Sequence, residues 1–174
     1  MNIHGEKTVL RAIESADKSL LLELINDPNI EKMLGGSSFP VSEAAQIKWI
    51  QDQIGRSDVL RCIIADRNDP DQGIGTVILS DIDQKNGIAQ IHLKLAAACQ
   101  HKGYGTDALK TLVNYAFKQM RLNCIYAHVL SYNEASQKLF RKCGFIKEGI
   151  LRARTYKDGN YVDAVSYSIL CDEV

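Results

Sequence analysis

Apolar and polar residues alternate strictly in one stretch near the middle of the chain. Within residues 88–95 the two kinds take turns, in the order Gln90, Ile91, His92, Leu93, Lys94 and Leu95. Successive side chains of a strand point to opposite faces, so this stretch predicts a β-strand with one apolar and one polar face. Beyond residue 104 the apolar positions recur every three or four residues. This predicts an amphipathic helix through Ala108, Leu109, Leu112, Val113, Ala116, Phe117 and Met120.

A turn with two glycines joins this strand to this helix. It reads Gln100-His101-Lys102-Gly103-Tyr104-Gly105-Thr106. A turn of this kind before a helix directs several backbone N–H groups at one point, and the helix dipole adds partial positive charge there. The turn therefore predicts a phosphate-binding site. The alternative is a tight connection in which glycine only permits unusual backbone angles.

Two nucleotide motifs do not fit this turn. A P-loop needs a lysine directly after its second glycine, whereas Gly105 is followed by Thr106-Asp107. The dinucleotide form GxGxxA fits residues 103–108, but it also requires an acidic residue about twenty positions on, at the end of the next strand. The next expected strand, 124–130, carries no acid. A Rossmann-like nucleotide-binding enzyme is therefore the weaker reading of the chain.

The same patterns predict the remaining elements. Strands are expected at 8–13, 59–65, 74–79, 124–130, 145–156 and 161–170, with a dense turn at 67–73. Helices are expected after Ser15 or Asp17, ending at Asp27-Pro28, after Ser42, and from Glu134 to Lys142 with Asn133 as cap. Residues 29–40, which include Gly35-Gly36-Ser37-Ser38, are expected to be irregular. The order predicts a mixed α/β fold, one sheet covered by helices.

The first two helices and the irregular segment between them precede the glycine turn. They are expected to form one wall of an acceptor pocket. Trp49 lies in the second of these helices, and it belongs either to that pocket or simply to the hydrophobic core.

Composition limits the possible functions. The chain has 174 residues, 45% of them hydrophobic, which suits a single domain over residues 1–174. With 21 basic and 21 acidic residues and no basic block, no nucleic acid partner is expected. No apolar run approaches the roughly twenty residues that cross a bilayer, so no membrane association is expected. The N-terminus has no secretory core, and we expect a cytoplasmic protein.

Five cysteines are spread along the chain, at positions 62, 99, 124, 143 and 171. No two of them form a CxxC pair, so the sequence predicts free thiols in a reducing compartment and no structural disulfide. A metal site needs paired ligands at short spacing, and the sequence has none. No metal cofactor is therefore expected.

Two segments resemble motifs of the GNAT family of acetyl-CoA-dependent N-acyltransferases. The turn at 100–105 is similar to the family's Arg/Gln-x-x-Gly-x-Gly/Ala pyrophosphate loop, and residues 133–145 are similar to its Asn-x-x-Ala/Ser-x-x-x-Tyr-x-x-x-Gly-Phe segment. The resemblance covers nearly the whole chain. Asn26-Asp27-Pro28, Glu148-Gly149 and 158–163 are similar to the branch that acetylates ribosomal-protein N-termini, which also includes amino-sugar and polyamine acetyltransferases.

The resemblance implies a twisted, mostly antiparallel sheet of about seven strands, in which strands four and five, at 88–95 and 124–130, splay apart to admit acyl-CoA. The acetyl-CoA cosubstrate would contact Leu93, Leu95 and Asn133 through its pantetheine arm and the loop Gln100, His101, Lys102, Gly103, Tyr104, Gly105 and Thr106 through its pyrophosphate. The implied acceptor is an amine-bearing small molecule or a protein N-terminus: an α-amine, an amino sugar or a polyamine. The oligomeric state is left open, with a homodimer as the candidate assembly.

The chain departs from the family pattern at the proton donor. Phe140 stands where many members carry a tyrosine that protonates the leaving thiolate, and it has no proton to give. In the ribosomal branch the serine at the place of Ser136 is thought to take this role. Ser136 and Phe140 lie four residues apart, on one helix face. Tyr132 is a second candidate acid. Each of these side chains also has a purely structural reading, as a cap, a filler or an apolar anchor.

The proton acceptor is less defined. The ribosomal branch has a glutamate base where this chain has Thr155. His92, on the polar face of the central strand, has a pKa range suited to proton transfer, and His128 and Glu148 are further candidates. An α-amino acceptor with a pKa of about 7.7–8.0 is partly neutral at pH 7 and needs little more than water as base. The expected reaction is direct attack of the amine on the thioester, with an oxyanion donor near residues 94–97. The alternative is an acyl-CoA sensor without turnover.

Overall fold

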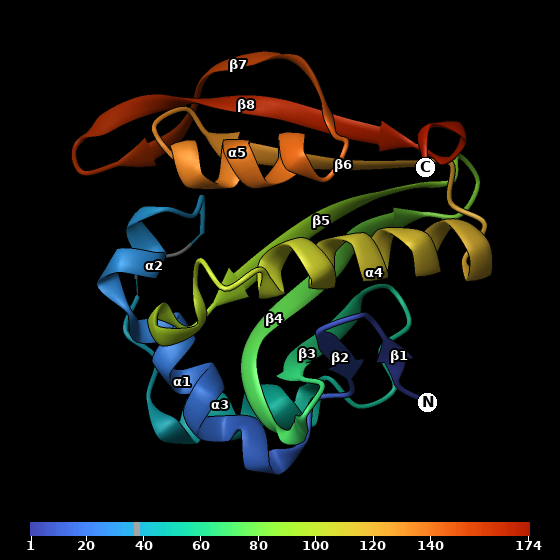
Figure 1. Ribbon diagram of the computed structural model, residues 1–174. Helices are drawn as coiled ribbons and strands as arrows, with labels where there is room; N and C mark the ends of the chain where they lie inside the picture. Colours follow the sequence, from blue (N-terminus) through green and yellow to red (C-terminus); the bar gives the residue numbers. More distant parts are fainter. Residues whose placement is uncertain (37–38) are drawn as a thin grey trace.

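The computed structural model describes residues 1–36 and 39–174, and its framework is one eight-stranded sheet (Figure 1). The spatial order of the strands is β1-β2-β3-β4-β5-β6-β8-β7, and among these neighbours the β5–β6 pair is parallel while the others are antiparallel. The strands are β1 (Ile3–His4), β2 (Thr8–Arg11), β3 (Leu60–Asp66), β4 (Asp69–Asp83), β5 (Ile88–Leu95), β6 (Cys124–Leu130), β7 (Ile146–Lys157) and β8 (Asn160–Leu170). The expected mixed α/β fold with a mostly antiparallel sheet is confirmed, and the short β1 adds to the seven expected strands.

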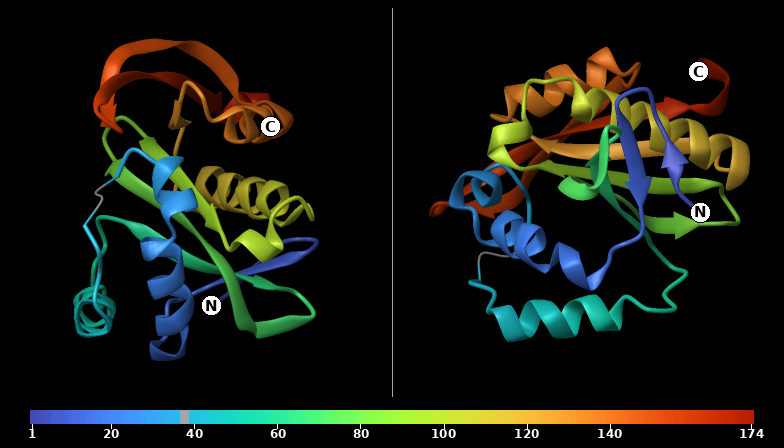
Figure 2. Two further views of the ribbon diagram at one scale, coloured as in Figure 1. Left: turned by 90° about the vertical axis from the view of Figure 1, so that its left-hand side faces the viewer. Right: turned by 60° about the horizontal axis from the view of Figure 1, so that its bottom comes forward.

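Helices cover both faces of this sheet. The α-helices are α1 (Lys18–Asn26), α2 (Pro28–Lys32), α3 (Glu43–Asp52), α4 (Tyr104–Gln119) and α5 (Glu134–Lys142), and the short 3-10 helices are η1 (Ser15–Asp17), η2 (Ala97–Cys99) and η3 (Cys171–Glu173). Figure 2 shows α1 and α3 on one side of the green strands and α4 on the other. Within the described ranges, no helix is both long enough and apolar enough to cross a membrane.

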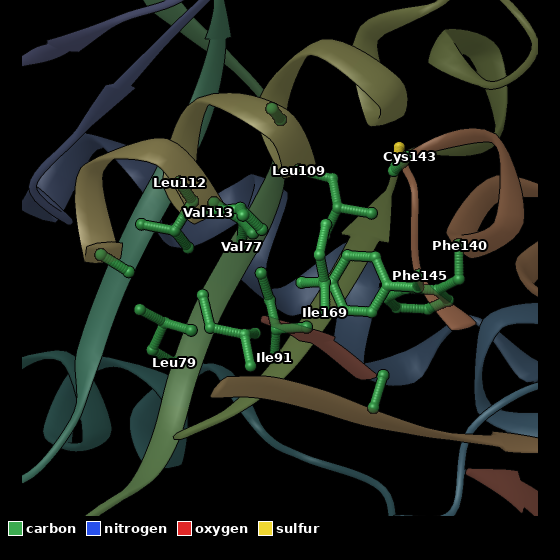
Figure 3. Packing of buried hydrophobic residues seen from close by; sticks show 14 of the residues in the cluster. Val77, Leu79, Ile91, Leu109, Leu112, Val113, Phe140, Cys143, Phe145 and Ile169 are labelled. Carbon is green, nitrogen blue, oxygen red and sulfur yellow. The ribbon is translucent and has the colours of Figure 1, made fainter. Parts of the chain in front are cut away.

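The core lies between α4, α5 and the sheet. The apolar stripe of α4 supplies Leu109, Leu112 and Ala116, each of which is fully buried. Figure 3 shows these leucines packed against Val77 and Leu79 of β4 and against neighbouring strands. Burial of this one face explains why α4 forms as an amphipathic helix.

Local signals explain the helix starts. Ser42 accepts a hydrogen bond from the Ala45 N–H at 3.2 Å, and Asn133 accepts one from the Ser136 N–H at 3.1 Å, so these two expected caps are confirmed. The cap expected at Ser15 or Asp17 does not form: Ser15 lies in η1, and Asp17, at the N-cap position of α1, makes no capping hydrogen bond with its side chain in the described part of the chain. The last hairpin turns at Asp158 and Gly159, whose φ angles of 49° and 83° are typical of a type I′ turn.

Several boundaries differ from those the sequence predicts. Part of the segment expected to be irregular is the helix α2, because Asp27 caps it by accepting from the Asn29 N–H and Pro28 occupies its first position. Ser37 and Ser38 lie outside the described residues. The turn expected at 67–73 is short, since β4 begins at Asp69 and pairs with β3 through two register shifts. The first strand ends at Arg11, not at residue 13.

Candidate active site

The parallel strands β5 and β6 part after three residue pairs. Ile88, Ala89 and Gln90 pair with residues 124–126, and no further pairing between the two strands occurs in the described chain. Figure 1 shows the two strands together at one end and diverging towards α2. The backbone edges of residues 91–95 and 127–130 that face each other are therefore not joined by a sheet ladder. We call these two stretches the parted segments.

Apolar side chains gather beside the parted segments at the start of α4. Leu93 and Leu95 of β5 and Leu139 of α5 are partly buried against the core. A Cβ atom added to Gly105 would lie 3.3 Å from Leu95 Cδ1, 3.6 Å from Leu139 Cδ2 and 3.7 Å from Leu93 Cδ2. Three elements thus pack closely at Gly105, a buried residue that has no side chain.

The turn before α4 has the backbone geometry that the two glycines predict. Gly103 is the N-cap residue with φ 88°, and His101 has φ 59°, so two left-handed residues bend the chain into the helix. Within the part of the chain that is described, no side chain caps the N-terminus of α4. The N–H groups of its first turn therefore remain available to an anion.

Side chains of the turn are anchored away from its N–H groups. Gln100 Nε2 donates to the Leu95 carbonyl at 3.2 Å, and the Tyr104 hydroxyl donates to the Asp66 carboxylate. His101 and Lys102 are exposed, and Thr106 is partly buried. Lys7, which the sequence pattern did not indicate, brings its Nζ to 3.4 Å from the Lys102 carbonyl. That ammonium adds positive charge beside the turn.

The N-terminus of α5 lies on the other side of the parted segments. Asn133 is buried, and its Nδ2 donates to the Met33 carbonyl at 3.1 Å. The Tyr132 hydroxyl donates to the Lys32 carbonyl at 2.5 Å. Ser136 is partly buried, and its hydroxyl has no hydrogen-bond partner among residues 1–36 and 39–174. Of the two candidate acids, Ser136 thus keeps its hydroxyl available while Tyr132 is already committed.

Phe140 faces the core. Its ring is 5% exposed, packs edge-on against Phe145 with centroids 5.0 Å apart, and stacks on Tyr167 at 6.2 Å. Figure 3 shows Phe140 and Phe145 side by side. The side chain at the usual tyrosine position therefore contributes to packing.

The polar face of β5 carries a short hydrogen-bonded chain. The Ser80 hydroxyl donates to Asp81 Oδ2 at 3.1 Å and lies 2.9 Å from His92 Nε2. The hydroxyl has one proton to share between these two partners. When that proton goes to the carboxylate, His92 donates from Nε2 and its Nδ1 carries the free lone pair. Partial desolvation lowers the pKa of His92, although Asp81 opposes the shift. His92 is therefore mainly neutral at pH 7.

The other candidate bases lie on β6 and β7. Desolvation lowers the pKa of His128, an exposed residue, and Arg154 lowers it further while Glu148 opposes. Thr155 is partly buried on β7. His128 and Glu148 are thus close enough to influence each other, but neither has the relay that orients His92.

A pocket of about 390 Å³ opens on this face, between α1, α3 and the sheet. Trp49 lines it, so both helices and the tryptophan form a pocket wall. Arg61 and Lys94 also line it. No motif pointed to these two cations, because their shared position depends on strand pairing.

Residues 7–146 match the acetyltransferase (GNAT) domain. The chain belongs to the GNAT acetyltransferase family. It is therefore an acetyl-CoA-dependent N-acetyltransferase. The uncharacterised N-acetyltransferase p20 of Bacillus licheniformis is 32% identical over 172 residues, covering 97% of this chain and 95% of p20. YdaF of Bacillus subtilis (strain 168), named as a candidate ribosomal N-acetyltransferase, is 30% identical over 175 residues, covering 95% and 92%.

A solved structure has the same fold. The spermidine N-acetyltransferase from Vibrio cholerae, in complex with CoA and spermine, superimposes with a TM-score of 0.88 at 26% identity, covering 96% of this chain and 97% of that one. In the described part of the chain, residues 1–36 and 39–174 contain no cluster of three or more His, Cys, Asp or Glu side chains that could hold a metal ion. All five cysteines are free.

Proposed function

We propose that this acetyltransferase binds acetyl-CoA with the pantetheine arm between the parted segments and transfers the acetyl group directly to a primary amine in a ternary complex. The observation that carries the proposal is the end of β5–β6 pairing at Gln90 beside an uncapped helix N-terminus. The arm contains amide groups that can bond to the unpaired strand edges. Leu93, Leu95 and Leu139 would pack against its apolar portion.

The pyrophosphate would lie on the turn before α4. Backbone N–H groups of residues 100–105 supply donors, and the α4 dipole and Lys7 supply positive charge. Asn133 already uses Oδ1 on the Ser136 N–H and one Nδ2 proton on the Met33 carbonyl. It has a second Nδ2 proton to offer to the arm.

Our proposed chemistry is one nucleophilic displacement. The neutral amine attacks the thioester carbon, a C–N bond forms, the C–S bond breaks, and CoA leaves as a thiolate. The amine proton passes to His92 Nδ1, directly or through water. His92 is suited to this because its neutral form predominates and Ser80, hydrogen-bonded to Asp81, can accept a proton from His92 Nε2, which leaves Nδ1 free. Ser136 would give a proton to the thiolate, and a backbone N–H near residues 94–97 would stabilise the oxyanion.

The proposed acceptor is a primary amine of a kind that related enzymes use. A protein α-amine, an amino sugar and a polyamine are the candidates, since YdaF is named for ribosomal N-acetylation and the Vibrio cholerae structure is a spermidine N-acetyltransferase. CoA release measured against a panel of these amines tests the reaction. Absence of release with every amine, in the presence of bound acetyl-CoA, would refute the transferase assignment for these acceptors.

The binding site is tested by Gly105→Val. The new side chain would occupy the space between Leu95, Leu139 and Leu93, so acetyl-CoA affinity should fall at least about tenfold in a calorimetric titration. Gly149→Ala is the control, because a Cβ there meets nothing within 4 Å. Unchanged affinity for Gly105→Val, with a normal melting curve, would place the cosubstrate elsewhere.

A further inference from the structure

The pocket between α1, α3 and the sheet combines an apolar wall with positive charge. Leu21, Leu24 and Trp49 supply apolar surface, and Arg61 and Lys94 supply two cations. Among the described residues that line the pocket, none is acidic. The volume of about 390 Å³ is in the range of small-molecule sites.

Arg61 is held in place without a carboxylate. Its Nη1 donates to Gln53 Oε1 at 2.7 Å, and its guanidinium carbon lies 5.6 Å from the centroid of the Trp49 ring. A neutral amide and an aromatic face orient the group but do not neutralise it. The remaining guanidinium N–H groups are therefore available to a ligand.

Lys94 is half-buried on β5, and its ammonium has no hydrogen-bond or ion-pair partner in the described ranges 1–36 and 39–174. Desolvation lowers its pKa, and no neighbouring charge contributes to the shift. A partly desolvated ammonium without a counter-charge is costly for the fold. An anionic ligand would offset this cost, whereas a cationic ligand would add repulsion.

The pocket is also placed to serve the transfer reaction. Lys94 and Leu95 are neighbours on one strand, so their side chains point to opposite faces. Leu95 faces Gly105, where the cosubstrate is proposed to bind, and Lys94 faces the pocket. A molecule held in the pocket would therefore lie on the face of β5 opposite to Leu95, beside one of the two parted segments.

We propose that the acceptor of this enzyme is an amine that carries an apolar body and an anionic group, carboxylate or phosphate, with the anion bound by Lys94 and Arg61. This inference rests on the proposed function, which supplies the amine. It separates this chain from a polyamine acetyltransferase, because a polyamine brings several positive charges to a pocket that already holds two.

Trp49 makes binding measurable without catalysis. It is the single tryptophan of the chain, so intrinsic fluorescence reports on this pocket. Titrations would compare ligands that differ only in the anion: phenylalanine with phenylalaninamide, and 6-aminohexanoate with 6-aminohexanamide. The phosphonate analogue of phenylalanine distinguishes phosphate from carboxylate, and spermidine is the cationic comparison. We expect the anionic member of at least one pair to bind at least about tenfold more tightly than its amide.

Lys94→Met tests the assigned contact. This substitution should lower the affinity for the preferred anionic ligand at least about tenfold, and it should change the affinity for the corresponding amide less than twofold. Lys48→Met is the matched control, since Lys48 is exposed on the same helix as Trp49 and does not line the pocket. It should leave both affinities unchanged.

The outcomes separate this inference from the proposed function. Anion-selective binding without CoA release from any amine would support the pocket assignment and refute the transfer to such acceptors. CoA release that is fastest with spermidine or with the amides would support the transferase and overturn the anionic acceptor. Equal loss of amide and anion binding in Lys94→Met would also overturn it.

Discussion

Ser136 and Phe140 occupy one face of α5 but meet different surroundings. Phe140 is 5% exposed and packs between Phe145 and Tyr167, whereas the Ser136 side chain is partly buried near the helix N-terminus. The positive end of the helix dipole favours a hydroxyl that gives up a proton there. Phe140 therefore contributes to packing, and Ser136 is the residue of this face that can donate a proton.

Ser136→Ala should lower kcat about 10- to 100-fold with little change in acetyl-CoA affinity. The Asn133 cap should survive, because Ser136 donates to it from the backbone N–H. Steady-state kinetics with chemistry as the slow step, together with calorimetry, checks both parts. A wild-type kcat under those conditions would exclude Ser136 as the proton donor.

Asp107 ties the turn before β2 to α4. Its carboxylate accepts hydrogen bonds from the N–H groups of Glu6, Lys7 and Thr8 and from the Thr8 hydroxyl, at 2.6–3.0 Å. Desolvation alone would raise the pKa of Asp107, but these hydrogen bonds, led by that of Thr8, outweigh it and lower the pKa below the ordinary 3.8. The stabilisation is therefore present above pH 3.8 and is lost as pH falls through the lower, folded-state pKa.

Asp107→Asn should reduce the free energy of unfolding at pH 7 and flatten its decline below about pH 4. The asparagine side chain would replace one acceptor oxygen by an NH₂ group, which would face the backbone N–H groups that donate to Asp107. Urea denaturation at several pH values measures both effects. Asp172→Asn, an exposed acid in η3, serves as the control and should follow the wild-type curve. An identical pH profile for Asp107→Asn would contradict the assignment.

At the scale of elements, α2 is held at its C-terminal end by three donors from the other half of the sheet. Lys157 Nζ donates to the Glu31 carbonyl at 3.1 Å and pairs with the Glu31 carboxylate, while Tyr132 and Asn133 donate to the next two carbonyls. Donors at a helix C-terminus satisfy its free carbonyls, and the Lys157 cation complements its dipole. This short helix therefore connects the two sides of the parted segments.

Lys157→Met should destabilise the protein by about 2 kcal/mol, somewhat less than the roughly 3–5 kcal/mol of a fully buried pair, because the Glu31 side chain is 28% exposed. The matched control is Lys138→Met, which removes a surface pair with Glu134 at 4.0 Å and should change stability by less than about 0.5 kcal/mol. Thermal or urea unfolding compares the two. Equal effects would mean that the Lys157 contacts contribute no more than a surface pair.

The five cysteine thiols differ in burial across the molecule. Cys171 is exposed, whereas burial raises the pKa of Cys62 and of Cys143 to about 11. A thiol reagent should find five reactive groups after denaturation, but in the native protein it should modify Cys171 first and the two buried thiols last. Mass spectrometry of timed samples gives the order. A melting temperature that drops on adding reductant would instead indicate a disulfide.

Local patterns in the sequence predicted most of the fold, the turn before α4 and the cap of α5. The alternation in β5, the glycines at 103 and 105 and the Asn133 cap each act within a few residues, so their effect is visible in sequence. Asp27-Pro28 was interpreted only as the end of α1, although a cap followed by proline also signals the start of α2. The two cations of the pocket could not be predicted in this way. Arg61 and Lys94 meet only because β3, β4 and β5 pair side by side.

Among the strands of the described residues, backbone pairing attaches β6, β8 and β7 to the other five only at residues 88–90. The backbone junction is short there, although side chains of residues 124–174 share the core with α4. We therefore expect any partial opening of the sheet to separate residues 124–174 as one unit. A ligand seated between the parted segments would touch both units and would raise the free energy of that partial opening. Ligand binding would therefore slow amide hydrogen exchange in β6 and β8. Such slowing would show that the ligand couples the two halves of a single sheet.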